Sequence, residues 1–500
     1  MSKLIIRTVF MLSIACLFLL GFETRQEFNY TPKFIEKKRG PIKIPKGQEY
    51  RFGYLEVPEN RNDPNSTMIR LPVYYFKSRN PNPQPDPIIY TVGGPGSSTM
   101  PSAAYAKDYQ YLDDRDFIFF EQRGTAYAQP HLDCPEWAQA IYQSNLPQSS
   151  EQESEQLLAK ATIDCRNRLI KSGIDLNGYS TTASAADIAD LVKVLGIKEY
   201  NLLTLSYGTK IAQVMLRDYP KGIRSVVMDS PLPLEVNYDE ESISNLMASL
   251  ELLLDDCAQD PNCNKAFPNL KERFFTFLKE QNKAPLEVRV ENPNSGKEEV
   301  FYLKGKDFVS FIAGVNTSGV ADVPLQIQQL LNGDLSYVRQ QLQGLFDGPG
   351  SGAGQGMRLS VWCHEEYPFV SQQKVLAEKQ KYPEIKGLSP VVFEKEICEI
   401  WGIQHAFLKE NQAVKSKIPV LLISGEYDNE TPPYWAQQMQ KNLPNSHHIV
   451  FKGWKHGPTT YWSNPCGMQV ANQFFNDPSK SPEIECFKEI QKPEFRIKEK

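Results

Sequence analysis

The chain is 500 residues long, 41% hydrophobic and 11% aromatic, and it carries a formal net charge of −5. This length is enough for one large domain with an insertion, or for two to three domains, and the apolar content is ample for a packed core. The mild negative charge gives no basic patch or stripe, so nucleic acid is not an expected partner.

The first 25 residues have the pattern of a targeting segment. Lys3 and Arg7 accompany an almost wholly apolar stretch, residues 8–22, which is short for a membrane span and typical of a signal peptide. Cys16 gives this stretch a faint resemblance to a lipoprotein box, so a lipid or uncleaved N-terminal anchor is the alternative. No later stretch of the sequence is apolar enough to span a bilayer. An exported protein, periplasmic or extracellular, is therefore expected.

The nine cysteines support the same compartment. Apart from Cys16 they number eight, and an even count in an exported chain predicts up to four disulfides. Sequence alone leaves the connectivity open, but the spacing favours local pairs: Cys134 with Cys165, Cys257 with Cys263, Cys363 with Cys398, and Cys466 with Cys486. No cysteine or histidine cluster has the spacing of metal ligands, so neither a metal nor a cofactor is expected.

The first part of the chain predicts a sheet. Segments 51–57 and 68–77 alternate or run apolar between turn residues, as antiparallel edge strands do. Buried strands are predicted at residues 87–92, 116–120, 202–205 and 223–228. Helices at 183–195 and 210–218 separate the later strands, the first with apolar residues at i, i+3, i+4 and i+7. Strands and helices that alternate at this spacing predict a parallel sheet with helices on its faces.

The pattern changes near Leu234. The following segment is polar and helical, with a glycine-rich run at 348–356, and we interpret it as a lid inserted after a core strand. The core then resumes with strands at 418–425 and 447–451 and a last helix near 468–475. The predicted divisions are a signal peptide or anchor at 1–25, an α/β core at 26–234, a helical lid at 235–409, and the second part of the core at 410–500.

Three residues suited to nucleophilic catalysis each follow one of these strands. Ser206 lies in the tight corner between a strand and a helix, Asp428 follows strand 418–425, and His456 follows strand 447–451. The carboxyl ends of parallel strands share one edge, and Ser…Asp…His is the chain order of the α/β-hydrolase triad. His456 would take the serine proton and Asp428 would orient the imidazole. Taken singly, each has a structural alternative, namely a turn serine, a turn cap and a surface histidine.

A glycine-rich turn, Gly93-Gly94-Pro95-Gly96, follows the strand at 87–92. It is either a plain loop or an oxyanion loop, because glycine lets the backbone approach a substrate and point an N–H at it. We predict that the backbone N–H groups of Gly94 and Tyr207 form an oxyanion hole. No Lys-Ser/Thr pair follows the turn, so a phosphate site is not expected.

Four segments together resemble the proline iminopeptidase and tripeptidyl aminopeptidase family of serine peptidases. They are Gly93-Gly94-Pro95-Gly96, Glu121-Gln122-Arg123-Gly124-Thr125, Leu205-Ser206-Tyr207-Gly208 and Gly453-Trp454-Lys455-His456-Gly457. The resemblance covers about residues 50–235 and 410–475. It implies an α/β-hydrolase core, with a mostly parallel sheet flanked by helices, under a helical cap. The chain departs from the family at Glu121, where aspartate is usual, and at Thr204, where glycine is frequent.

The resemblance also implies a serine aminopeptidase that cuts peptides near a free N-terminus through an acyl-enzyme, and the N-terminal segment and the cysteines predict that it is exported. It maps nucleophile, acid and base onto Ser206, Asp428 and His456. An aminopeptidase must recognise an α-ammonium group, and the adjacent acids Glu365 and Glu366, beside Cys363, are our candidates for binding it. A solvated acidic turn is the alternative for these two residues.

Two other functions fit the same machinery. A carboxylesterase or lipase needs the same three catalytic residues, because the fold does not fix the substrate. A non-catalytic binding protein that kept the fold is the third hypothesis. The sequence leaves open how many residues each cleavage would release and which oligomer forms.

Overall fold

The computed structural model describes residues 30–147, 150–483 and 485–498, so the expected signal segment lies outside the described residues. Its centre is a nine-stranded sheet with the strand order β1-β2-β3-β5-β4-β6-β7-β10-β11. The strands are β1 Lys33–Lys37, β2 Tyr50–Pro58, β3 Met68–Phe76, β4 Gln84–Thr91, β5 Arg115–Phe120, β6 Tyr200–Leu205, β7 Ile223–Asp229, β10 Val420–Gly425 and β11 Ser446–Phe451.

The sheet is antiparallel at one edge and parallel elsewhere. Strands β1, β2, β3 and β5 pair antiparallel in that order, as the alternating segments predict. All pairs from β5 through β4, β6, β7 and β10 to β11 are parallel. The central strands are buried along almost their whole length, as expected of parallel strands covered on both faces. The predicted α/β-hydrolase sheet is therefore confirmed.

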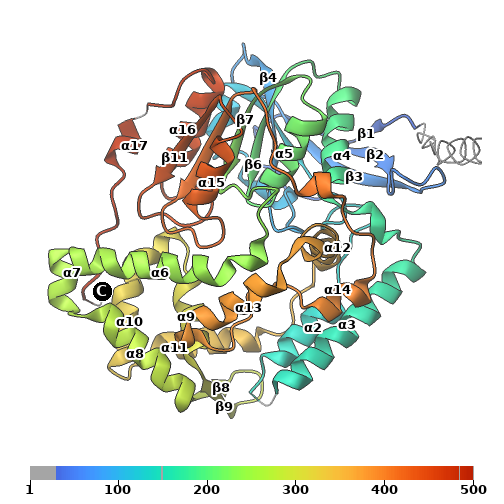
Figure 1. The fold of residues 1–500 in the computed structure, drawn as a ribbon. Helices are drawn as coiled ribbons and strands as arrows, with labels where there is room; N and C mark the ends of the chain where they lie inside the picture. The colour runs from blue at the N-terminus through green and yellow to red at the C-terminus, as the bar shows by residue number, and fades with distance from the viewer. Residues whose placement is uncertain (1–29, 148–149, 484, 499–500) are drawn as a thin grey trace, which may run out of the picture.

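Neighbouring residues of each central strand face different layers of helices. Leu202 and Leu422 pack on one face, against helices α4 Thr181–Val194, α5 Gly208–Asp218 and α15 Pro433–Gln440. Leu203 and Leu421 pack on the other face, which α16 Cys466–Asn476 covers. Figure 1 shows α4, α5 and α15 in front of the sheet. The period of two in a strand separates the apolar residues into these two cores.

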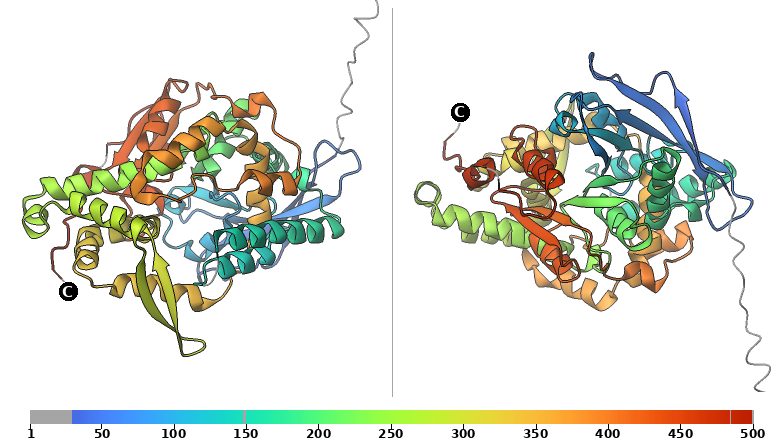
Figure 2. Two further views of the ribbon diagram at one scale, coloured as in Figure 1. Left: turned by 60° about the horizontal axis from the view of Figure 1, so that its bottom comes forward. Right: turned by 90° about the horizontal axis from the view of Figure 1, so that it is seen from above.

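The segment between β7 and β10, which we call the insert, forms most of a helical layer next to the sheet (Figures 1 and 2). Its helices are α6 Ser242–Gln259, α7 Pro261–Ala266, α8 Leu270–Lys283, α9 Gly305–Ala313, α10 Val323–Leu331, α11 Ser336–Gly344, α12 Gln355–Glu365, α13 Gln372–Lys381 and α14 Lys395–Trp401. The insert also contains an antiparallel hairpin, β8 Leu286–Asn292 and β9 Lys297–Leu303, where the sequence analysis expected helix. Val288 and Val290 alternate there with charged residues, which is a strand pattern.

A second contribution to the helical layer comes from the first part of the chain. Helices α2 Pro135–Ser144 and α3 Glu151–Lys171 lie beside α14 in Figure 1, and Trp137 packs edge-on against Phe393 of the insert. The sequence analysis assigned this layer to the insert alone. The α2–α3 hairpin lies between β5 and β6 in the sequence. It therefore joins the helical layer from a segment that precedes the insert.

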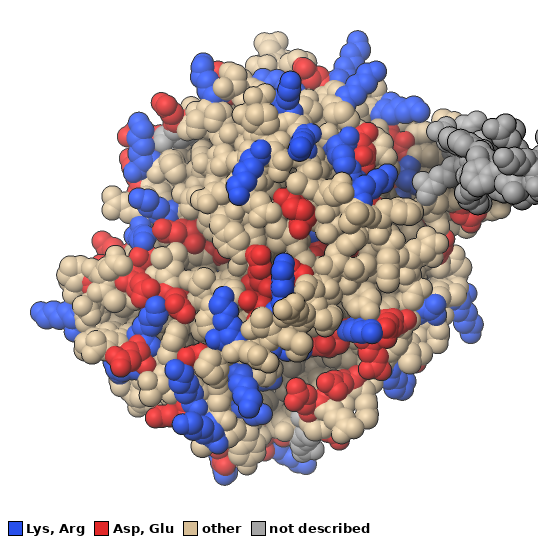
Figure 3. All heavy atoms as spheres, in the orientation of Figure 1, with Lys and Arg blue, Asp and Glu red and all other residues tan. Residues whose placement is uncertain are grey.

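All four predicted cysteine pairs form disulfides. They join Cys134 to Cys165, Cys257 to Cys263, Cys363 to Cys398 and Cys466 to Cys486. None of the helices among the described residues combines the length and apolar content needed to cross a bilayer. Figure 3 shows basic and acidic side chains interspersed over the face that it presents, in keeping with the mild net charge.

A buried ion pair joins the loop after β5 to helix α4. Arg123 and Asp187 both have fully buried side chains, and the guanidinium donates to the carboxylate over 2.6 and 2.7 Å. The remaining donors of Arg123 bond to backbone carbonyls, including those of Glu59 and Gly178. The partly buried Arg61 pairs with the same carboxylate. Each nitrogen of the buried Arg123 guanidinium therefore has an acceptor.

We expect Asp187→Ala to lower the free energy of unfolding by about 3–5 kcal/mol, because Arg123 would be left buried without its counter-ion. Urea unfolding followed by circular dichroism measures this. Asp164→Ala is the control, since Asp164 forms an exposed ion pair with Lys160 on α3 and such pairs contribute about 0–1 kcal/mol. Equal losses in the two variants would contradict the expectation.

Candidate active site

Ser206 lies in a strained corner between β6 and α5. Its φ of 57° falls in the left-handed region, which non-glycine residues rarely adopt. The corner is held at both ends: the Ser206 N–H donates to the Asp229 carbonyl over 2.9 Å, and the Ser206 carbonyl accepts from the Thr209 N–H and hydroxyl. A Cβ on Gly208 would lie 2.9 Å from the Val92 carbonyl oxygen, so only glycine fits at that position. The geometry is that of a nucleophile elbow.

Asp428 and His456 lie in the loops after β10 and β11, and the structure brings them together. His456 Nδ1 lies 2.8 Å from Asp428 Oδ2. The carboxylate also accepts from the Thr431 hydroxyl over 2.7 Å and from the backbone N–H groups of Glu430 and Thr431. Asp428 is therefore buried with all its oxygens bonded. This fixes the ring orientation of His456.

The two groups stabilise each other's charged forms. Burial alone would raise the pKa of Asp428, but the His456 charge and the hydrogen bonds hold that pKa below its usual range. Burial alone would lower the pKa of His456, but the Asp428 charge, their hydrogen bond and Glu430 raise it to about 9. Glu430 Oε2 lies 3.8 Å from His456 Nε2, on the ring nitrogen that faces away from Asp428.

The end of β7 connects the elbow to the histidine loop. The Asp229 carbonyl holds Ser206, while the Asp229 carboxylate accepts from the N–H and hydroxyl of Thr459. The hydroxyl of Ser230 accepts from the Gly457 N–H over 2.9 Å. Burial raises the pKa of Asp229 to about 6 against the opposing hydrogen bonds from Thr459. Among the described residues Ser206 and His456 form no direct hydrogen bond.

The glycine turn after β4 packs against the elbow. A Cβ on Gly93 would lie 2.5 Å from the Ser206 Cβ and 2.9 Å from the Tyr207 nitrogen. Gly94 has a φ of 113°, which places it outside the range of other residues. Neither the Gly94 N–H nor the Tyr207 N–H donates to any group in the described part of the chain. The two predicted oxyanion donors are thus close together and free of protein acceptors.

Comparisons with known proteins find similar hydrolases and peptidases. A family model described as "TAP-like protein" matches residues 388–486, the stretch that contains Asp428 and His456. "Serine protease Hip1" of Mycobacterium tuberculosis is 21% identical over 503 residues, which cover 88% of this chain and 90% of that protein. "Tripeptidyl aminopeptidase" of Streptomyces coelicolor is 29% identical over 188 residues, 36% of this chain and 34% of that one. "Putative hydrolase YuaR" of Escherichia coli is 22% identical over 88% of both chains.

The chain is similar to tripeptidyl aminopeptidase-like α/β-hydrolases. The predicted family resemblance is therefore confirmed, and the fold and the relatives make the protein a serine peptidase-like hydrolase. The assignment of individual catalytic residues rests on the geometry of this chain.

Glu121 supports the glycine turn of this hydrolase. Its buried carboxylate accepts from the Ser98 hydroxyl over 2.7 Å and from the N–H groups of Thr99 and Met100 over 2.8 and 3.1 Å. Burial raises the pKa of Glu121, against these hydrogen bonds. The sequence analysis used this residue only for the resemblance and missed its role. The sequence feature that could have indicated this role is a carboxylate directly after a buried strand, β5. That strand pairs with β4, which leads into the glycine turn.

The other departure from the family, Thr204, is directed away from the elbow. Its side chain is buried in β6, where the hydroxyl lies 3.4 Å from the Val227 carbonyl of β7. Threonine is therefore accommodated between two strands instead of beside Ser206.

Glu365 and Glu366 are buried at the end of α12 and already have partners in the protein. Glu365 accepts from the N–H and hydroxyl of Thr181 over 2.6 and 2.5 Å. Glu366 forms an ion pair with Lys210, near the start of α5. These contacts attach α12 to the two helices beside the elbow. Binding of a substrate amine by these carboxylates stays a prediction.

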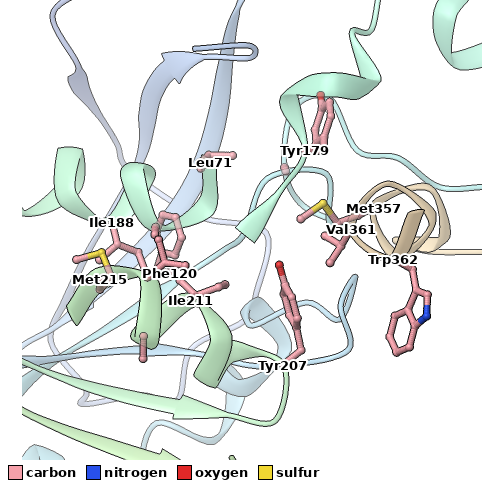
Figure 4. Close-up of a cluster of buried hydrophobic side chains, with 14 of the residues drawn as sticks. Leu71, Phe120, Tyr179, Ile188, Tyr207, Ile211, Met215, Met357, Val361 and Trp362 are labelled. Atoms are coloured by element: carbon pink, nitrogen blue, oxygen red, sulfur yellow. The ribbon is translucent and has the colours of Figure 1, made fainter. Parts of the chain in front are cut away.

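The Tyr207 side chain completes this attachment. Its hydroxyl lies 2.8 Å from the Thr181 hydroxyl, which also bonds Glu365. Figure 4 shows Tyr207 directed toward Met357 and Val361 on α12. The residue after the proposed nucleophile thus packs directly under this helix.

We expect Glu121→Gln to lower the free energy of unfolding by about 1–3 kcal/mol, since a donor would replace one acceptor oxygen and leave a buried N–H unsatisfied. Urea unfolding provides the measurement. Glu298→Gln, on the exposed strand β9, should change stability by less than about 0.5 kcal/mol. A loss no larger than that in Glu121→Gln would show that the carboxylate does not hold the turn.

Proposed function

We propose that this hydrolase is an exported serine aminopeptidase that cleaves peptides near a free N-terminus. The observation that carries the proposal is the 2.8 Å Asp428–His456 pair on the same sheet edge as the strained Ser206. The end of β7 contacts both parts, which supports their action as one site. The four disulfides and the relatives support export.

The chemistry follows from these positions. His456 Nε2 would take the proton of the Ser206 hydroxyl as Oγ attacks the scissile carbonyl carbon. The carbonyl oxygen becomes an anion, and the free N–H groups of Tyr207 and Gly94 would donate to it. The imidazolium, stabilised by Asp428, then gives its proton to the leaving amine. Water repeats the sequence on the acyl-enzyme and restores Ser206.

The names of the relatives support peptides as the substrates. One relative is named a tripeptidyl aminopeptidase and another a serine protease. An ester would react at the same serine, so a carboxylesterase remains the second candidate. The two differ in whether a free α-amino group and an amide bond are required.

We expect the wild-type protein to react with a fluorophosphonate probe and to hydrolyse aminoacyl p-nitroanilides. Ser206→Ala should lose the labelling and lower kcat by at least about 10³-fold, because the nucleophile is gone. Blocking the substrate N-terminus should abolish turnover by the wild type. Mass spectrometry of the products from a small peptide set would give the number of residues released.

Two results would separate the candidates. Equal turnover of free and N-blocked substrates, or turnover of acyl esters alone, would favour the esterase. Labelling that persists in Ser206→Ala would remove Ser206 as the nucleophile.

The pH profile tests the role of His456. Only the neutral imidazole can accept the serine proton, and the raised pKa of about 9 keeps it protonated at lower pH. We therefore expect kcat/KM to rise with pH and its midpoint to lie above the ordinary histidine value of about 6.5. Glu430→Gln removes a negative charge near Nε2 and should lower that midpoint by roughly half a unit.

Glu298→Gln, on the exposed hairpin, is the control variant and should leave the midpoint unchanged. A midpoint that stays in place in Glu430→Gln would show that Glu430 does not act on the imidazole. A midpoint below about 6 in the wild type would contradict the assignment of the base to His456.

A further inference from the structure

Arg358, in the first turns of α12, is a guanidinium without a carboxylate partner. In the described part of the chain it forms no ion pair and no hydrogen bond, and its Nε atom is buried and unpaired. The guanidinium carbon lies 5.7 Å from the centre of the Trp362 ring, one turn further along the helix. A buried N–H donor without an acceptor, such as this Nε–H, is unfavourable, and the partly exposed side chain leaves its other donors open to a ligand.

Two other buried arginines have a partner for each guanidinium nitrogen. Arg115 donates to Asp86, to the Asn476 side chain and to the Phe475 carbonyl. Arg123 donates to Asp187 and to backbone carbonyls. Arg358 therefore differs from these two residues, and also from Arg61, whose Nε is likewise unpaired but whose guanidinium pairs with Asp187 and Asp190.

Helix α12, which carries Arg358, contacts the elements around Ser206 near both of its ends. At the start of the helix, Gly354 touches the glycine turn: a Cβ on Gly96 would lie 2.4 Å from the Gly354 carbonyl oxygen. At its far end, Glu366 pairs with Lys210 of α5, the helix that begins just after Ser206. The helix thus lies across the elbow, between two contacts with the catalytic loops.

The charges around Arg358 point to the same place. Burial lowers the pKa of Arg358, and the nearby Tyr238, Glu430 and Asp239 oppose this effect. Glu430 is the residue whose carboxylate lies 3.8 Å from His456 Nε2. Trp362, beside the guanidinium, packs against Tyr238, and the Tyr238 ring in turn contacts Trp435 of α15, the helix that follows the Asp428 loop. Arg358 therefore lies on the side of the site that carries Asp428 and His456.

Neither nearby carboxylate serves as its partner. Asp239 accepts from the Trp362 indole N–H over 3.2 Å and from the Val392 N–H over 3.1 Å, and burial raises its pKa to about 7. The side chain of Glu430 is 55% exposed and lies beside His456. The guanidinium is thus left available to a ligand.

We propose that Arg358 binds a carboxylate group of the substrate and so gives the site a preference for substrates that carry one. The planar fork of arginine matches a carboxylate with two parallel N–H···O bonds, and the partly buried position of Arg358 would strengthen them. The carboxylate is either the C-terminus of a short peptide or an aspartate or glutamate side chain. That the ligand is a peptide rests on the proposed function, whereas recognition of the carboxylate does not.

Calorimetry on the Ser206→Ala protein tests this without turnover. The probes are trialanine, trialanine amide, Ala-Ala-Glu amide and Ala-Ala-Gln amide. We expect the free acid or the glutamate peptide to bind roughly tenfold more tightly than its uncharged match, as a charge-assisted pair gives. The first pair reports a C-terminal carboxylate and the second pair a side chain.

Adding Arg358→Gln should abolish the preference while binding of the uncharged peptides stays the same. Arg358→Lys keeps the charge but lacks the planar guanidinium, so it should retain only part of the preference. This variant also provides a test if Arg358→Gln does not fold. Arg273→Gln, at an arginine of α8 that bonds Gln328, is the matched control and should retain the full preference.

A carboxylate preference that survives in Arg358→Gln would overturn the proposal. The proposal would also fail if the Ser206→Ala protein showed no carboxylate preference, or if it bound none of the four peptides. Mass spectrometry of wild-type reactions with the same peptides tests the proposed function separately. A carboxylate preference without peptide products would retain the Arg358 site and remove the aminopeptidase.

Discussion

The end of strand β7 is the point on which the candidate active site depends. In the sheet β7 lies between β6, which leads to Ser206, and β10, which leads to Asp428. The register aligns Asp229 with Leu205 on one side and with Ile423 on the other. Its backbone and side chain then bond to the elbow and to the histidine loop. Three loops from distant parts of the sequence are therefore fixed relative to one strand end. The parallel order of these strands is what brings the loops to one edge.

This anchoring also explains how strain is tolerated. Ser206 and Ser230 both have positive φ angles, at adjacent strand ends. A residue held in such a conformation costs on the order of 1–3 kcal/mol, and it persists only where its surroundings fix it. Here Ser206 is bonded on both sides, and the Ser230 N–H donates to the Ile423 carbonyl over 2.7 Å. Within the described residues the Ser206 hydroxyl forms no hydrogen bond, so it stays open to a substrate and to the imidazole of His456.

The sequence was sufficient where the pattern is local. Apolar runs bounded by turn residues located the sheet strands, and the glycines at 93 and 208 marked the close approaches, because a Cβ there would collide with the backbone or with Ser206. The chain order of Ser206, Asp428 and His456 indicated one edge, and the structure joins the last two directly.

The sequence was insufficient where a partner lies far along the chain. The pairing of Glu366 with Lys210 spans 156 residues and leaves no local pattern. The contact between Asp229 and the histidine loop depends on Thr459, which is 230 residues away.

The β8–β9 hairpin was missed for a different reason: its alternation is short and lies within a polar, otherwise helical segment. Propensity and periodicity describe neighbours, whereas these roles are set by tertiary contacts. For the same reason, an acidic pair beside a cysteine in the sequence fits a ligand site and a structural contact equally well. In this structure Glu365 and Glu366 attach α12 to the helices beside the elbow. Arg358, on the same helix, has no ion-pair or hydrogen-bond partner among the described residues.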